Sequence, residues 1–131
     1  MTTASPGDRT TVSREITTER IETFAELTGD ENPLHLDPEY AADGLFDGPI
    51  AHGMLAAGII SSALASLPGD IIYLEQSLSF ENPVYPGQTV TATAEVLEDL
   101  GRDRYRVETV ASVDEEVVAS GEATVLSLEH E

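Results

Sequence analysis

The sequence contains no cysteine and no lysine, and it has only one long apolar run. Without cysteine, the chain can form no disulfide framework, no zinc–thiolate site and no thiol nucleophile. Its first residues are polar and lack the apolar core of a secretory signal peptide, so we expect a flexible N-terminus over residues 1–11. The apolar run, residues 51–67, is too short and too interrupted by serine to favour a membrane span. We therefore expect a protein that does not use a membrane as a partner.

Positive charge is scarce. The chain has 25 acidic residues against six basic ones, all of them arginine, and a formal net charge of −19. Such a surface repels nucleic acid and anionic lipid, so we expect neither as a partner. The acids are spread along the chain and spare only the apolar run, which argues against a disordered acidic tail. We interpret the composition as the adaptation of a cytoplasmic protein from a halophile, because concentrated ions screen repulsion between like charges.

The first half of the sequence has helical signals. Residues 12–16 predict a short strand, and residues 17–29 predict a helix between an N-cap at Thr17 and a glycine stop at Gly29. Asp37-Pro38 opens a second, short helix through residue 42, with Asp37 as its N-cap. The run 51–67 predicts a helix that is apolar on most sides and therefore buried.

The second half changes to a period of two. Apolar and polar residues alternate over four stretches, which predicts long half-buried antiparallel strands near Ile72–Phe80, Val90–Val96, Tyr105–Val113 and Val117–Val125. A length of 131 residues with 40% apolar content is enough for one domain, which we place at residues 12–131. We expect an α+β fold in which an antiparallel sheet curls around the central apolar helix.

One short segment combines an acid with an imidazole. Asp30 and His35 are five residues apart, a spacing that neither a helix nor a strand brings to one face. Pro33 fixes its own φ and pushes Asn32 towards extended geometry, so the chain must bend there. Such a bend can turn Asp30 and His35 towards one point, and a carboxylate–imidazole pair suits general acid–base chemistry.

Simpler interpretations exist for each of these residues taken alone. Asp30 is also typical of a turn or capping carboxylate after a helix, and His35 of a surface histidine. Asn32 before proline more often braces its own loop, so we assign it a supporting role. Asp37 is explained fully by N-capping, and we exclude it from the chemistry.

Three segments of the sequence resemble a known family, the MaoC-like, (R)-specific enoyl-CoA hydratases of the hot-dog fold. They are Asp30-x-Asn32-Pro33-x-His35, Ala51-His52-Gly53-Met54, and Leu78-Ser79-Phe80-Glu81-Asn82-Pro83-Val84 with Gly87. The resemblance runs from about Thr17 to the C-terminus. Its closest form is the short, single-hot-dog hydratase that supplies (R)-3-hydroxyacyl-CoA for polyhydroxyalkanoate synthesis. The acidic surface and the lack of lysine depart from that family's usual composition.

The resemblance implies a reaction and a set of roles. Water adds reversibly to trans-2-enoyl-CoA to give (R)-3-hydroxyacyl-CoA, without a metal or organic cofactor, in a homodimer. Asp30 and His35 correspond to the catalytic pair, and the backbone amide of Gly53 corresponds to the oxyanion donor. Ser61 matches a position whose hydroxyl supports the catalytic aspartate; a serine bonded to its own preceding helical turn is the alternative.

The residues around Gly53 carry part of this argument independently. Gly53 falls in the first turn of the predicted helix, where backbone N–H groups lack intrahelical partners and the helix dipole favours negative charge. Close helix packing is the alternative role for this glycine, and both can hold. His52 either caps the helix or shapes the site.

The arginines allow two interpretations. Arg102, Arg104 and Arg106 cluster in the sequence, and they suit either phosphate binding or cross-strand pairing with acids. We therefore leave them out of the predicted site.

Other functions remain open at this point. A 3-hydroxyacyl-thioester dehydratase acting on acyl carrier protein would use the same residues in the opposite direction. A hot-dog acyl-CoA thioesterase would release free thiol instead of hydrating a double bond. A non-enzymatic acyl-CoA-binding module would need the fold and the pocket, but it would not need Asp30 together with His35.

The strongly negative net charge leads us to predict that the stability of the protein depends on salt. At a net charge of −19, the melting temperature should fall as KCl is lowered from molar to millimolar concentration, because unscreened like charges repel. Thermal unfolding across that range measures the effect, and kcat/KM for an anionic CoA thioester should rise with salt over part of it. A melting temperature that does not change at low salt would contradict the halophilic interpretation.

Overall fold

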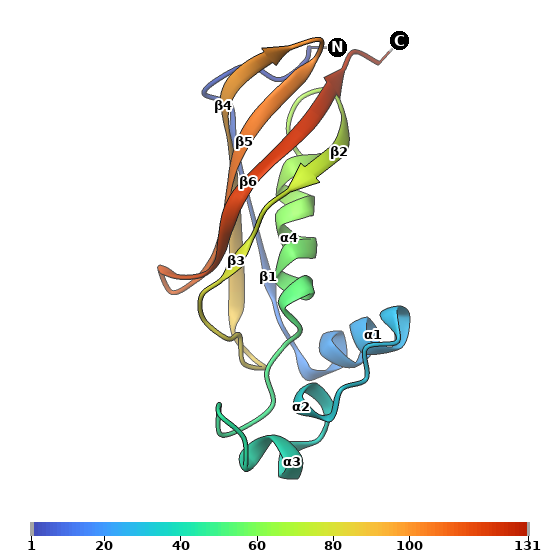
Figure 1. Ribbon diagram of the computed structural model, residues 1–131, viewed down its shortest axis with the longest axis vertical. Helices are drawn as coiled ribbons and strands as arrows, with labels where there is room; N and C mark the ends of the chain where they lie inside the picture. The colour runs from blue at the N-terminus through green and yellow to red at the C-terminus, as the bar shows by residue number, and fades with distance from the viewer. Residues whose placement is uncertain (1, 131) are drawn as a thin grey trace.

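The computed structural model describes residues 2–130 and contains one antiparallel sheet with helices on one side (Figure 1). The strands are β1 (Arg9–Glu15), β2 (Asp70–Gln76), β3 (Ser79–Phe80), β4 (Thr89–Gly101), β5 (Arg104–Val113) and β6 (Glu116–Leu128). The helices are α1 (Thr18–Thr28), α2 (Pro33–Leu36), α3 (Pro38–Ala42) and α4 (Gly53–Ala65). The α+β architecture predicted from the sequence is confirmed.

The sheet has the order β1-β4-β5-β6-β2, and β3 also pairs with β6. It curls along its length, and α4 lies against its inner face (Figure 1). The helix packs mainly on β4 and β1 and also contacts β5, β6 and β2. This arrangement is the sheet wrapped around a central helix that the periodicity of the sequence predicted.

Apolar packing between α4 and the sheet makes the core. Ile60 and Leu64 of α4 are at most 1% exposed, and the facing strands supply Val90, Val107 and Val125, which are fully buried. Burying one such side chain contributes about 1.5–3 kcal/mol, so this interface is a major source of the stability of the fold. No helix of the described chain has the length and apolar character that a membrane crossing requires.

A small helical lobe follows β1 and lies beside the start of α4 (Figure 1). Thr17 caps α1 by accepting a hydrogen bond from the Arg20 N–H, and Gly29 ends it in the left-handed conformation with φ 82°. Asn32 then caps α2, and Asp37 caps α3. The chain therefore changes direction between α1 and α2, and residues 30–32 form the bend predicted from Pro33.

The N-terminal prediction was wrong in extent. Strand β1 begins at Arg9, so residues 9–11 pair with β4 instead of forming part of a flexible end. Ala4 is 3% exposed, and its N–H donates to the Ser127 Oγ at 2.9 Å. These contacts depend on backbone amides meeting β4 and β6, which a polar side-chain composition does not reveal.

The strand predicted near Ile72–Phe80 was also wrong in part. It is divided into β2 and β3, and the side chains expected to face inwards are partly exposed, with Ile72 at 45%, Leu74 at 41% and Phe80 at 54%. Strand β2 lies at the edge of the sheet, and its register with β6 shifts between Tyr73 and Glu75. An irregularity in register changes which side chains face the core, so simple alternation misassigned them.

Gly121 in β6 makes a sharp stability test. A Cβ atom added there would lie 1.9 Å from the Ser77 carbonyl oxygen, so the link between β2 and β3 would have to move. We expect Gly121→Ala to cost about 1–3 kcal/mol of unfolding free energy, the usual range for overpacking. Gly48→Ala is the control, because nothing lies within 4 Å of a Cβ there. Denaturant unfolding in molar salt compares them, and equal stabilities would show that the Ser77–Gly121 approach is not constrained.

Candidate active site

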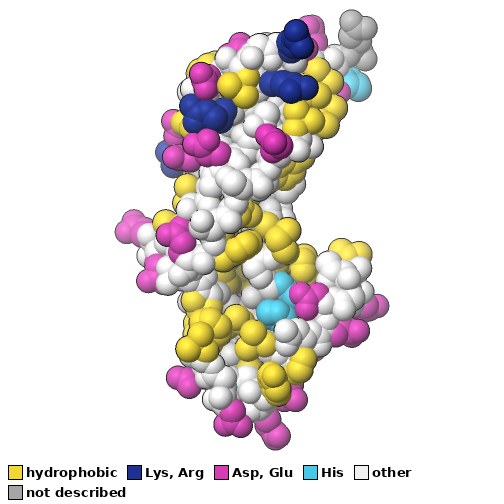
Figure 2. Space-filling view, in the orientation of Figure 1, with side chains coloured by type: hydrophobic (Ala, Val, Ile, Leu, Met, Phe, Trp, Pro, Cys, Tyr) yellow, Lys and Arg dark blue, Asp and Glu magenta, His cyan; other side chains and the backbone are white. Residues whose placement is uncertain are grey.

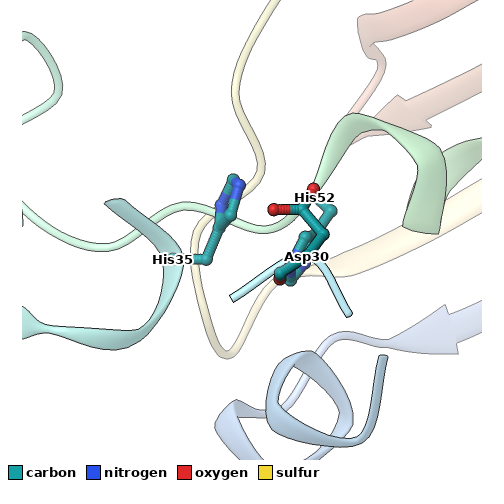
Figure 3. A group of neighbouring side chains, drawn as sticks. All are labelled: Asp30, His35 and His52. Carbon is teal, nitrogen blue, oxygen red and sulfur yellow. The ribbon is translucent and has the colours of Figure 1, made fainter. Parts of the chain in front are cut away.

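Asp30, His35 and His52 meet beside the start of α4 (Figure 3). Each offers one ligand or proton-carrying atom, and these atoms all lie within 4.8 Å of one another. Asp30 comes from the bend after α1, His35 from α2, and His52 from the residue before α4. The bend predicted from Asn32-Pro33 therefore brings the acid and the imidazole together, and it adds a second imidazole.

A backbone hydrogen bond fixes the orientation of His35. Its Nδ1 lies 2.7 Å from the carbonyl oxygen of Ile50. A carbonyl oxygen only accepts, so Nδ1 carries the hydrogen and Nε2 carries the lone pair. The ring is half-buried, and Nε2 is the atom that can take a proton from water.

The Asp30 side chain is open to solvent, whereas its backbone is fixed by two hydrogen bonds. The backbone N–H donates to Thr28 Oγ1 at 3.2 Å, and the backbone carbonyl accepts from His52 Nε2 at 2.8 Å. Across residues 2–130, its carboxylate forms no hydrogen bond or ion pair within the chain. The carboxylate is therefore available to a water molecule or a substrate.

Neighbouring polar residues have the structural roles that the sequence indicated. The Asn32 Oδ1 accepts from the Leu34 N–H at 3.1 Å and caps α2, which braces the loop that holds Asp30 and His35. Asp37 caps α3 by accepting from the N–H groups of Glu39 and Tyr40. A carboxylate occupied in this way is not part of the reactive group.

Gly53 is the first residue of α4. Within the described chain its N–H has no hydrogen-bond acceptor, which is usual for the first turn of a helix. A Cβ atom added at Gly53 would lie 3.0 Å from Cε1 of Phe80, so that ring stands directly over the glycine. Helix geometry thus supplies an open donor with positive dipole character, covered on one side by an aromatic ring.

Two cavities flank the Phe80 ring. One of about 260 Å³ is bounded by His52, Gly53 and Phe80 together with the segment after β3. The other, about 670 Å³, lies between α4 and the β2–β3 segment and is lined mainly by apolar side chains. Phe80 forms part of the wall of both, so it stands between the polar centre and the apolar cavity.

The supporting role expected for Ser61 stays a prediction. Ser61 lies on α4 eight residues after Gly53, which is roughly 12 Å along the helix axis, and it lines the larger cavity. No hydrogen bond joins its hydroxyl to Asp30 in the described residues. Ser61 shares that cavity with Phe24 and Thr28 of α1, the helix that ends just before Asp30.

The arginine cluster lies away from this centre. Figure 2 shows that the arginine side chains visible on this face, in dark blue, lie towards its upper end, whereas the helical lobe below carries acidic side chains in magenta. Arg106 pairs with Glu98 at 3.2 Å and Glu122 at 3.1 Å, and hydrogen bonds to these carboxylates raise the pKa of its guanidinium. Cross-strand pairing, one of the two interpretations of the cluster, is therefore what the structure shows for Arg106.

Geometry argues against a three-ligand metal site. The His35 Nδ1 and the His52 Nε2 are both bonded to backbone carbonyls, and the His52 Nδ1 is buried without a partner. Of the three residues, only the His35 Nε2 and the Asp30 carboxylate are then left as open donors, and two donors do not make a closed metal site. What remains is an acid–base pair beside a helix N-terminus.

Sequence reasoning did not resolve the role of His52, and it missed Phe80. His52 was left between capping and shaping roles, and Phe80 was assigned to the core. Both lie in segments that carried the family resemblance, but no spacing rule indicated that one would stack on His35 and the other would cover Gly53.

A curled antiparallel sheet packed around one helix is the architecture of the hot-dog proteins. Residues 3–119 match the model of the MaoC like domain, and the chain belongs to that family. It is 48% identical to the (R)-specific enoyl-CoA hydratase of Aeromonas caviae, over 69% of each protein. It is 42% identical to the enzyme of the same name from Rhodospirillum rubrum, over 92% of this chain and 85% of that one. The solved (R)-hydratase of Aeromonas caviae, described as involved in PHA biosynthesis, superposes with a TM-score of 0.88 at 36% identity, covering 94% of this chain and 96% of that one.

Proposed function

We propose that this protein is an (R)-specific enoyl-CoA hydratase, a hydro-lyase that adds water reversibly to trans-2-enoyl-CoA and forms (R)-3-hydroxyacyl-CoA. One observation carries the proposal: the open Asp30 carboxylate and the His35 ring, whose Nε2 bears the lone pair, meet beside the free N–H at the start of α4. The relatives named (R)-specific enoyl-CoA hydratase support the stereochemistry.

The reaction follows from these three groups. The His35 Nε2 takes a proton from a water molecule that the Asp30 carboxylate orients, and the water oxygen bonds to C3. The electron pair of the double bond then moves towards the thioester oxygen, where the Gly53 N–H stabilises the negative charge. The proton held by the His35–Asp30 pair passes to C2, so the residues return to their starting state.

The larger cavity suits the acyl chain of the substrate. It begins beside Phe80 and Met54, near the reacting centre, and is walled by apolar side chains of α4 and the β2–β3 segment. Transfer of an acyl chain from water to such a surface is favourable by about 0.8 kcal/mol per methylene. The polar chemistry and the apolar chain thus occupy adjoining parts of one site.

We also propose that the protein is a homodimer. Strand β2 is an edge of the sheet, and Ile72, Tyr73 and Leu74 on it are each at least 40% exposed, as is Met54 on α4. A monomer rarely leaves an apolar edge strand of this kind uncovered. A second copy on this face would also close the open side of the larger cavity, and light scattering in molar salt measures the expected mass of two chains.

The setting we propose is a salt-rich cytoplasm, where the product supplies polyhydroxyalkanoate synthesis. The net charge of −19 supports the first part, and the description of the Aeromonas caviae enzyme supports the second. Acidic side chains around the helical lobe, including Glu31, Asp43 and Asp47, disfavour docking of an acidic carrier protein. Free CoA thioesters are therefore the substrates we propose.

The loss of conjugated absorbance of crotonyl-CoA in high salt tests this function directly, with chiral analysis of the product. We expect the (R)-3-hydroxy thioester with CoA still attached. Release of free thiol would instead identify a thioesterase. Binding of crotonyl-CoA without turnover would identify an acyl-CoA-binding module.

The acid–imidazole pair gives a prediction with an internal control. Asp30→Asn and His35→Gln should each lower kcat by about 10²–10⁴-fold, because each removes proton transfer with little change of shape. Asp37→Asn should retain near wild-type kcat, since asparagine also caps helices. Steady-state kinetics and circular dichroism separate loss of chemistry from loss of fold. An inactive Asp37→Asn beside an active Asp30→Asn would reverse the assignment.

Gly53 gives a prediction about the oxyanion. Gly53→Ala should lower kcat, because a methyl group crowds the place where the thioester oxygen meets the N–H. The Phe80 ring would also be crowded, at 3.0 Å, so the double variant Gly53→Ala/Phe80→Ala is the informative comparison. We expect it to remain slower than Phe80→Ala alone. Full recovery in the double variant would show that the ring, and not the substrate, was displaced.

A further inference from the structure

His52 is the most buried polar residue of the site, with 3% of its surface exposed. It is not needed to donate or accept a proton in the mechanism above. Its ring is nevertheless in contact with both members of the catalytic pair, and it directly precedes the oxyanion donor. A histidine enclosed in this way has a cost that a hydrophobic residue would avoid, so its contacts require an explanation.

The first contact holds Asp30. The His52 Nε2 lies 2.8 Å from the Asp30 backbone carbonyl oxygen, which accepts the N–H. Asp30 follows the helix-ending Gly29 and lies outside any helix or strand, so the regular structure does not fix its backbone. This hydrogen bond links the bend after α1 to the residue before α4, across 22 positions of sequence.

The second contact holds His35. The two imidazole rings stack with centroids 3.9 Å apart, and Phe24 packs against His52 with centroids 4.8 Å apart. His52 therefore lies between the α1 side chain and the catalytic ring. Since the Ile50 carbonyl already fixes His35 Nδ1, the stacking restricts the remaining freedom of the ring that carries the reactive Nε2.

The third connection is to Gly53. His52 is the N-cap residue of α4, yet its side chain forms no capping hydrogen bond; its backbone carbonyl accepts from the Leu55 N–H at 3.0 Å. Anchoring the His52 ring thus anchors the peptide that carries the Gly53 N–H. The usual reason for a polar N-cap side chain does not apply here.

The buried Nδ1 of His52 indicates why this position holds an imidazole and not an apolar ring. The Nδ1 atom is buried, and no hydrogen-bond partner reaches it within the described chain. A phenylalanine of similar size would fill the same space without leaving a polar atom unsatisfied. The Nε2–H donor is the feature that phenylalanine lacks, so the structure retains the imidazole for its bond to Asp30.

We propose that His52 is a positioning residue for the proposed hydration reaction, in which one buried imidazole aligns the Asp30 carboxylate, the His35 ring and the Gly53 amide. The inference rests on the proposed function for its kinetic consequence, whereas the hydrogen-bonded geometry is a property of the free protein. Misplacement of a reacting group by about 1 Å costs on the order of 10²-fold in rate.

Two substitutions separate the donor from the ring. His52→Phe keeps an aromatic ring against His35 but removes the donor, and His52→Gln keeps an N–H donor but removes the ring. We expect His52→Phe to lower kcat for crotonyl-CoA by about 10- to 100-fold with KM changed less than about threefold, a loss of alignment rather than of binding. We expect His52→Gln to retain a higher kcat than His52→Phe.

Ile59→Val is the matched control. Ile59 is a buried residue of the same helix, 7% exposed, and it lies six residues after Gly53, roughly 9 Å along the helix axis. It should lower the melting temperature slightly and leave kcat unchanged. A His52→Phe enzyme with wild-type kcat would overturn the proposal, and so would equal kcat values for the phenylalanine and glutamine variants.

A spectroscopic test does not depend on turnover or on the folding of a variant. Long-range ¹H–¹⁵N spectra of the histidine-labelled wild-type protein in molar salt should show His52 as the Nε2–H tautomer and His35 as the Nδ1–H tautomer. An Nδ1–H tautomer at His52 would overturn the proposal even if the enzyme is active. Conversely, if the wild type does not hydrate crotonyl-CoA, the proposed function fails, while the tautomer still decides whether His52 holds Asp30.

Discussion

Packing of α4 inside the curled sheet is the interaction on which the rest of the structure depends. Ile60, Ala63 and Leu64 are buried on the strands, so the helix cannot shift along its axis without opening the core. The fixed axis fixes the position of the first helical residue, Gly53, and with it the direction of the open N–H. A rigid helix can therefore present a donor with a precision that a loop would not provide.

The remaining parts of the site are attached to this fixed point by a few hydrogen bonds. The Ile50 carbonyl, just before α4, holds His35, and His52 holds the Asp30 backbone. The lobe of α1 to α3 contains short helices that depend on caps at Thr17, Asn32 and Asp37. The large apolar interface thus gives stability, whereas short polar links set the reactive geometry at small energetic expense.

Sequence patterns predicted those features that local chemistry determines. The caps at Thr17 and Asp37, the bend at Pro33 and the buried helix follow from rules that concern a few neighbouring residues, and the structure contains them. The exposed edge of β2 and the strand pairing of residues 9–11 depend on distant backbone partners, so alternation and composition misassigned them. A partner for the Ser61 hydroxyl likewise depends on distant parts of the chain, which local patterns do not place.

The convergence of Asp30 and His35 was predictable from the sequence, whereas the contacts that support them were not. Asp30 and His35 stand in one short motif with a proline between them, so local stiffness alone indicates that they converge. His52 reaches Asp30 across 22 residues and stacks on His35 across 17, and only the tertiary fold brings those rings together. A hydrophobic ring at that position would have satisfied the packing, and the periodicity of the sequence would look the same.

The acidic charge of this protein opposes binding of the anionic CoA thioester that we propose as its substrate. CoA carries phosphates, yet the structure uses Arg106 for pairing with Glu98 and Glu122 and shows acidic side chains over the helical lobe. In concentrated salt the Debye length falls to about 3 Å at 1 M, so charges beyond direct contact contribute little to attraction or repulsion. Substrate binding must then rely on short-range contacts: the apolar cavity for the acyl chain and the Gly53 N–H for the thioester. These contacts keep their strength in salt because burial of apolar area and a desolvated hydrogen bond are not screened. An acidic surface and an apolar site are therefore compatible with each other in concentrated salt.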